Sequence, residues 1–279
     1  MYSKLSCCDF AFPLISHDEA LHLIRTLGFS GVDIGLFENR SHLQPSSEFQ
    51  NVSASAAALK SRLDAHSLLA SDIFMQAELD MCAYASNHFD PARREHARTL
   101  FLKTLEYATI VGSRHVSALP GVWFETESYE ASYDRCVEEH IWRVAEAKKA
   151  GLSFGIEAHV GCIVPTTRQA LQFIKDVPGL GLTLDYSHFV RQGEVETAVD
   201  ILLPYANHFH ARGARNGQLQ SCLSESEIDF SRVPKKLLDT GFTGWICVEY
   251  AWTPNWEDCC RNDNLCETIL TKQCIDRSI

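Results

Sequence analysis

Four short apolar runs in the second half of the chain each end on an acid or an imidazole. The runs are FGIE, LTLD, HFH and ICVE, and their last residues are Glu157, Asp185, His210 and Glu249. Three carboxylates gathered in one place would repel one another and lose solvation unless a cation neutralised them. Three oxygen ligands and one imidazole suit Mn²⁺, Mg²⁺ or Co²⁺, and Zn²⁺ is an alternative that this oxygen-rich set does not select. The pattern predicts one divalent metal ion, with Mn²⁺ favoured.

The elements that must bring these residues together follow a regular alternation along the chain. We expect strands over residues 4–12, 31–37, 68–75, 114–119, 152–157, 180–185, 206–210 and 244–250. We expect helices over residues 16–28, 53–67, 90–112, 129–151, 167–177, 194–203, 234–240 and 255–275. Eight strand–helix units in about 250 residues predict a single (β/α)8 TIM barrel, here over residues 1–279. A doubly wound open sheet is the alternative, but no GxGxxG turn is present.

A barrel places the ends of all eight strands at one rim, which is where its chemistry lies. A single glutamate at a strand end is more often an ion-pair partner than a ligand. Four such residues in register on consecutive strands favour the metal site. His208 is expected to alternate away from His210 and to pack between barrel and helices. The helix over 129–151 is expected to bury Val137, Ile141, Val144 and Ala145.

Composition and charge narrow the function classes. The 279 residues are 46% hydrophobic and 22% charged, as in ordinary globular proteins, and no apolar run is long enough to span a membrane. The formal net charge of −11 argues against a nucleic-acid partner, which needs a basic face. A neutral or weakly charged small molecule fits better.

The eleven cysteines are scattered and show no CxxC spacing. We therefore expect reduced, partly buried thiols rather than a zinc-thiolate site or a disulfide framework. The first residues lack the apolar stretch of a signal peptide, so we expect a cytoplasmic protein.

From GFSGVDIG near residue 30 to GWICVEY near residue 247, the chain resembles the xylose isomerase-like sugar isomerase/epimerase superfamily. This superfamily includes ketose 3-epimerases, inosose isomerases and dehydratases, hydroxypyruvate isomerase and endonuclease IV. The resemblance makes Glu157, Asp185, His210 and Glu249 the metal ligands. It makes Glu157 and Glu249 the acid/base pair as well, and His188, three residues after Asp185, a substrate contact. The implied reaction runs on a keto-sugar or keto-polyol through a metal-bound cis-enediolate.

The sequence departs from the ketose 3-epimerase pattern at two positions. Ile163 stands where those enzymes carry a substrate-binding glutamate, and Asn216 stands where they carry an arginine. The substrate therefore need not be a simple ketose.

Several nearby residues are further candidates. His159, two residues past Glu157, is expected to be an extra acid/base group, a fifth metal ligand or a partner of a metal ligand. Arg212 and Arg215 are candidates for binding a substrate carboxylate or phosphate. Trp252 and Trp123 have the types and positions to cover an apolar sugar face, or simply to pack beneath a helix.

Three alternatives to an isomerase or epimerase stay open. A metal-dependent lyase or dehydratase would use the same ligands to eliminate a β-leaving group from a keto-sugar or oxidised glycoside. An endonuclease IV-like nuclease would need more ligands and a basic face. A non-catalytic sugar-binding barrel would bind metal without turnover. By analogy with similar barrels we expect a homo-oligomer.

Overall fold

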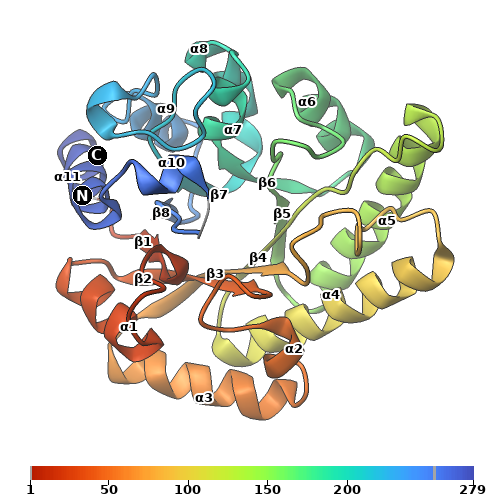
Figure 1. The fold of residues 1–279 in the computed structure, drawn as a ribbon, viewed down its shortest axis with the longest axis horizontal. Helices are drawn as coiled ribbons and strands as arrows, with labels where there is room; N and C mark the ends of the chain where they lie inside the picture. The colour runs from red at the N-terminus through yellow and green to blue at the C-terminus, as the bar shows by residue number, and fades with distance from the viewer. Residues whose placement is uncertain (1, 254–255) are drawn as a thin grey trace.

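The computed structural model describes residues 2–253 and 256–279. Eight parallel strands close into one barrel in sequence order, with β1 also paired to β8. Figure 1 shows the strands at the centre of the molecule and the helices arranged around them. The predicted single (β/α)8 barrel is confirmed.

The strands match the expected runs closely. Their bounds are Leu5–Cys8 (β1), Gly31–Phe37 (β2), Leu69–Gln76 (β3), His115–Ala118 (β4), Ser153–Ile156 (β5), Gly181–Asp185 (β6), Ala206–Ala211 (β7) and Ile246–Val248 (β8). Almost every strand residue is buried, because one face points into the barrel and the other lies under the helices.

The helices vary more in length. The α-helices are His17–Thr26 (α1), Pro45–Glu48 (α2), Val52–Ala65 (α3), Pro91–Val111 (α4), Tyr129–Lys149 (α5), Thr167–Asp176 (α6), Tyr186–Arg191 (α7), Glu196–Val199 (α8), Val233–Asp239 (α9), Glu257–Cys260 (α10) and Asn264–Ser278 (α11). Short 3₁₀ helices are Asp9–Ala11 (η1), Asp200–Tyr205 (η2) and Leu223–Glu225 (η3).

Side-chain caps begin α1 and α4, and a glycine ends α4. Ser16 and Glu19 form a reciprocal capping box at the start of α1, and Asp90 caps α4 ahead of its first-turn proline. Gly112 ends α4 with φ of 92°, a left-handed conformation that glycine adopts without steric cost.

Three predicted elements differ from the structure. The first strand ends at Cys8, where η1 begins, rather than reaching Phe12. The helix expected over 194–203 divides into α8 and η2, a tighter helix that contains Pro204. The closing helix divides into α10 and α11, and Asp263 caps the second piece. Its expected start at Asn255 lies outside the described residues.

The expected buried face of α5 is wrong for Ile141 and Ala145, which are exposed, whereas Val137 and Val144 are half-buried against the core. Ile141 is 48% exposed, and the buried side carries Glu139, His140 and Arg143 instead. Arg143 and Arg98 each contact the Glu139 carboxylate at 2.8 Å. Because these charges are paired, a charged side can face the barrel where an apolar stripe would be expected.

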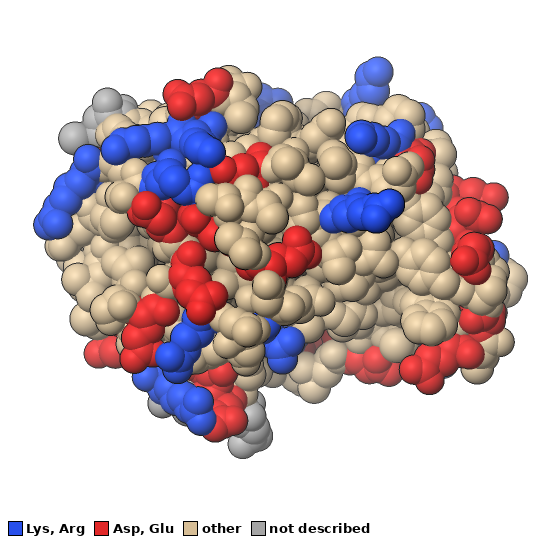
Figure 2. Space-filling view, turned by 90° about the horizontal axis from the view of Figure 1, so that it is seen from above, with Lys and Arg blue, Asp and Glu red and all other residues tan. Residues whose placement is uncertain are grey.

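None of the cysteines whose side chains the structure describes forms a disulfide, in line with the expectation of reduced thiols. No helix among the described residues is long and apolar enough to cross a membrane. On the face shown in Figure 2, acidic side chains lie among the basic ones, and the coloured residues form no continuous basic patch.

His140 illustrates how tightly the layer between α5 and the barrel is packed. Its ring lies 6.0 Å from that of Phe154 and 5.1 Å from that of Phe173. Its Nδ1 lies 2.8 Å from the Cys136 carbonyl oxygen, and its Nε2 is buried without a hydrogen-bond partner. Burial, together with the nearby Arg143 charge, lowers the pKa of His140 to about 3.

This buried imidazole predicts a loss of stability in acid. The unfolded chain takes up a proton near pH 6.5 while the folded chain does not, so stability falls as the pH drops from 6.5 towards 3. In His140→Phe, the decrease in the free energy of unfolding between pH 7 and pH 5 should be smaller by about 2 kcal/mol. Chemical denaturation at both pH values measures it. The exposed His96→Phe serves as the control and should keep the wild-type pH dependence; equal pH dependence in His140→Phe would contradict the prediction.

Candidate active site

The four residues predicted as metal ligands meet at the carboxyl-terminal rim of the barrel. Glu157 directly follows β5, Asp185 ends β6, His210 lies in β7 and Glu249 directly follows β8. All four are buried, and each offers one donor atom within 4.8 Å of the donor atoms of the other three. Because neighbouring parallel strands end at the same rim of the barrel, residues that are far apart in the sequence meet there.

His210 lies between two of the carboxylates. Its Nδ1 is 2.8 Å from Glu157 Oε1 and 3.3 Å from Glu249 Oε2. Glu249 Oε2 is buried and has no hydrogen-bond partner of acceptable geometry. Its ion-pair contacts with His210 and with Arg212, at 3.5 Å, are longer than a good hydrogen bond, and a bound cation would give this buried oxygen a direct partner.

Asp185 is fixed by two donors. Its Oδ1 accepts a hydrogen bond of 2.8 Å from the backbone N–H of Ser187, and so Asp185 also caps α7. Its Oδ2 accepts a hydrogen bond from Nη2 of Arg212, which lies 3.5 Å from Glu249 Oε2 as well. Arg212 is therefore tied to the acidic cluster, and the surrounding carboxylates, outweighing burial, raise its pKa.

Two further histidines lie beside this cluster. His188 Nε2 is 3.6 Å from Glu157 Oε2 and 3.5 Å from Asp185 Oδ2, while its Nδ1 accepts a hydrogen bond from the N–H of Val160. The ring of His159 packs 4.1 Å from that of His188. Burial and the nearby His188 lower the pKa of His159 to about 4, so its ring is neutral at pH 7.

Opposing effects set the charges of Glu157 and His210. Burial disfavours the ionised carboxylate, but His188 and His210 outweigh it and hold the pKa of Glu157 well below its ordinary value. Burial likewise disfavours a protonated His210, but Glu249, Asp33 and Glu157 outweigh it and raise its pKa. Without a metal ion, the protonated imidazole of His210 supplies positive charge among these carboxylates.

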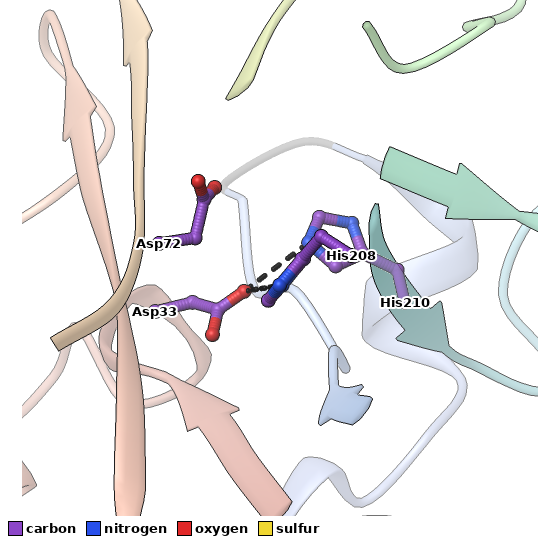
Figure 3. A group of neighbouring side chains, drawn as sticks. All are labelled: Asp33, Asp72, His208 and His210. Carbon is purple, nitrogen blue, oxygen red and sulfur yellow. Dashed lines mark hydrogen bonds and ion pairs between the residues drawn. The ribbon is translucent and has the colours of Figure 1, made fainter. Parts of the chain in front are cut away.

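Below the four ligands, the barrel interior holds a second polar layer that the sequence analysis missed. Asp33 of β2 accepts a hydrogen bond of 2.6 Å from His208 Nε2, and the same Oδ2 lies 3.3 Å from His210 Nε2 (Figure 3). Its other oxygen accepts hydrogen bonds from the hydroxyls of Ser6 and Ser71. His208 and His210 outweigh burial and hold the pKa of Asp33 well below its ordinary value.

The expected position of His208 is therefore wrong. Residues two apart in a strand point to the same face, and Figure 3 shows His208 and His210 both turned toward Asp33. Asp72, on β3, lies in the same layer and bonds His115 Nδ1 at 2.7 Å. Asp33, Asp72, His208 and His210 also bring donor atoms within 4.8 Å of one another. Several of these donor atoms, however, already take part in hydrogen bonds: Asp33 with the two histidines, and Asp72 with His115.

A cavity of about 270 Å³ opens above the four ligands, a volume at the low end for small-molecule sites. Its lining includes Glu157, Glu249, His159, His188, Arg212 and Trp252 from the predicted set. Asp185 and His210 lie deeper. The other lining residues are Phe10, Phe37, Arg40, Phe74, Gln76, Leu219, Ala251, Thr253 and Trp256.

Two predicted substrate residues lie outside the lining of this cavity. Arg215 bonds the side chain of Gln218 and lies 3.4 Å from Glu225 on the surface. Trp123 is 50% exposed, and its indole N–H donates to the carbonyl of Glu127.

The two positions that depart from the ketose 3-epimerase pattern also lie outside the cavity lining. Ile163 is buried in the apolar core, and Asn216 is held through its backbone N–H by the Glu227 carboxylate.

A sequence signal existed for some of the residues that were missed. Asp33 is the one acid within the apolar run GVDIGLF, and an acid at such a position requires a buried partner. Arg40 and Gln76 lie just beyond or at the ends of β2 and β3, and only the three-dimensional arrangement places them in the cavity.

Comparisons with solved structures show the same barrel. D-psicose 3-epimerase with D-tagatose from Clostridium cellulolyticum H10 aligns with a TM-score of 0.76 at 14% identity, over 99% of both chains. The IOLI protein with a bound zinc atom aligns with a TM-score of 0.73 at 18% identity, over 99% of both chains. The probable 3-DHS dehydratase AsbF from Bacillus anthracis aligns with a TM-score of 0.67 at 15% identity, over 97% of both chains.

These identities are low enough that the likeness establishes the fold alone. The search of curated proteins found no match. Residues 21–263, by contrast, match the family described as "Xylose isomerase-like TIM barrel". With most of its length matched and a closed eight-stranded barrel, the chain belongs to the xylose isomerase-like TIM barrel family.

Proposed function

We propose that the protein is a divalent-metal-dependent sugar isomerase or epimerase that acts on a keto-sugar or keto-polyol through a cis-enediolate. The observation that carries this proposal is the convergence of Glu157, Asp185, His210 and Glu249 below a cavity of small-molecule size. Solved structures of similar fold include an epimerase with a bound ketose and a protein with a bound zinc atom, which supports it.

The residues fit a divalent cation. Three carboxylates face one guanidinium, that of Arg212, which leaves two negative charges when the imidazoles are neutral. Glu249 Oε2 lacks a hydrogen-bond partner. Three oxygens and one nitrogen suit Mn²⁺ first, with Mg²⁺, Co²⁺ or Zn²⁺ as alternatives. When bound, such an ion would polarise a substrate carbonyl and acidify the neighbouring C–H.

The protein's own groups would move the proton. Glu157 and Glu249 enter the cavity from β5 and β8, which are not neighbours in the barrel. In the proposal, one carboxylate accepts the proton from the carbon next to the carbonyl, and the other returns a proton to carbon or oxygen. His188, beside Glu157, would donate a hydrogen bond to a substrate oxygen, and Arg212 would hold Asp185 in place.

A second candidate function is a lyase or dehydratase, which one observation favours. His159 lines the cavity, and its Nδ1 lies 2.7 Å from the carbonyl of Val160, which assigns the proton to Nδ1 and leaves Nε2 unprotonated. In this alternative, Nε2 of His159 would accept the proton from the carbon next to the carbonyl and then return it to the β-leaving group as that group departs from the enediolate. A probable dehydratase is among the structures of similar fold.

Hydrogen exchange tests the proposal. The Mn²⁺-loaded protein, incubated in D₂O with neutral and acidic keto-sugars, should introduce deuterium next to the carbonyl without loss of water. Glu157→Gln and Glu249→Gln should slow the exchange by about 10²- to 10⁴-fold, because each removes a proton-transfer group. Mass spectrometry and NMR measure both the label and the product.

The control variant is Glu225→Gln, an exposed acid outside the cavity that should exchange at the wild-type rate. An unsaturated product would contradict the isomerase proposal and support the lyase. No exchange with any member of the panel would contradict both functions.

The layer below the ligands gives a separate prediction about metal affinity. Asp33 faces Nε2 of His210 and so directs Nδ1 toward Glu157 and Glu249. Because partners of this kind orient metal-binding histidines, Asp33→Asn should weaken Mn²⁺ binding by about 10- to 100-fold in calorimetric titration.

Asp72→Asn is the matched control, since Asp72 is buried in the same layer but bonds His115. It should keep the wild-type affinity. Equal losses in the two variants would show that Asp33 acts only through general stability.

A further inference from the structure

Arg40 is an unusual component of the cavity. It follows β2 by three residues, after a turn in which Asn39 adopts a φ of 59°. Its guanidinium lies over the ring of Phe37 at 5.2 Å and donates a hydrogen bond to the side chain of Gln76. Arg40, Phe37 and Gln76 all line the cavity that contains Glu157 and Glu249.

The charge of Arg40 has no counterion in the part of the chain that the structure describes. No carboxylate oxygen there lies within 4.0 Å of its nitrogens, and its Nε is buried without a hydrogen-bond partner. Glu38, close in sequence, directs its carboxylate to Ser46 instead. Burial raises the pKa of the nearby Tyr84 to about 12, so this phenol is neutral and provides no negative charge.

The other arginine in the cavity is different. Arg212 lies against Asp185 and Glu249 and is neutralised by them. Arg40 is partly buried among aromatic side chains, and the same burial that excludes water lowers its pKa. A partly desolvated cation without an anion is unfavourable in the empty protein, and an anion brought by a ligand would remove that cost.

Aromatic side chains line the same cavity and are suited to contact a short carbon chain. They are Phe10 and Phe74, together with Trp252 and Trp256, which follow β8 in the sequence. Aromatic walls of this kind keep water out, which strengthens a charge-assisted hydrogen bond within the cavity.

We propose that Arg40 and Gln76 form a subsite for an anionic group of the substrate, either a carboxylate or a phosphate. This inference rests on the proposed function and narrows it: the substrate is an acidic keto-sugar or a sugar phosphate rather than a neutral ketose. The guanidinium pairs with the anion, and the Gln76 amide supplies a further hydrogen-bond donor.

Binding of three simple polyols to the Mn²⁺-loaded protein tests the subsite: sorbitol, gluconate and sorbitol 6-phosphate. One of the two anions should bind at least about tenfold more tightly than sorbitol in calorimetric titration, as expected for a charge-assisted hydrogen bond. The tighter of the two identifies the group as a carboxylate or a phosphate. Arg40→Gln should abolish the preference, and Arg40→Lys, which keeps the charge, should retain part of it.

Arg215→Gln is the matched control, because it removes an arginine that lies outside the cavity, and it should keep the full preference. The inference is overturned if neither anion binds more tightly than sorbitol, or if the preference persists in Arg40→Gln. Failure of the proposed function is recognised separately, as an absence of deuterium exchange. Loss of anion preference with exchange intact would remove only the subsite.

Discussion

The structure depends on how three carboxylates are kept together in a buried rim. Glu157, Asp185 and Glu249 lie around the imidazole of His210, and the guanidinium of Arg212 contacts two of them. Repulsion and desolvation would separate such groups in a flexible protein. In this fold the strand ends hold them, because the closed barrel fixes the register of β5 to β8. The stability of the barrel is thus what permits a site that favours a divalent cation.

The barrel interior supports that rim from below. Asp33, on β2, contacts His208 and His210 of β7 across the interior of the barrel (Figure 3), although β2 and β7 are not neighbouring strands. Its two serine partners, Ser6 and Ser71, come from the strands on either side of it. Because both oxygens of Asp33 have partners, its carboxylate is held in place and can fix the direction of the ligand histidine.

Much of the fold and the four converging residues could be predicted from the sequence, because apolar periodicity, caps and polar strand ends are local signals. Partnerships across the barrel could not. The two-residue spacing from His210 is enough to predict that His208 faces the barrel interior. Its partner Asp33, however, lies 175 positions away and could not be predicted. The buried face of α5 could not be predicted from its apolar residues alone, because charged side chains are buried there. The proposed role of Arg40 in substrate binding could not be predicted either, because it depends on the position of its guanidinium in the cavity and on the lack of a hydrogen-bond partner for its Nε.

The four residues at the rim should together bind one metal ion. Elemental analysis of the protein after incubation with Mn²⁺ and removal of free ion measures this directly. We expect one metal ion per chain in the wild type, and none in Glu157→Ala or His210→Ala. Glu225→Ala, which removes an exposed acid away from the cavity, should keep the ion. A metal-free wild type, or full metal content in both ligand variants, would contradict the account.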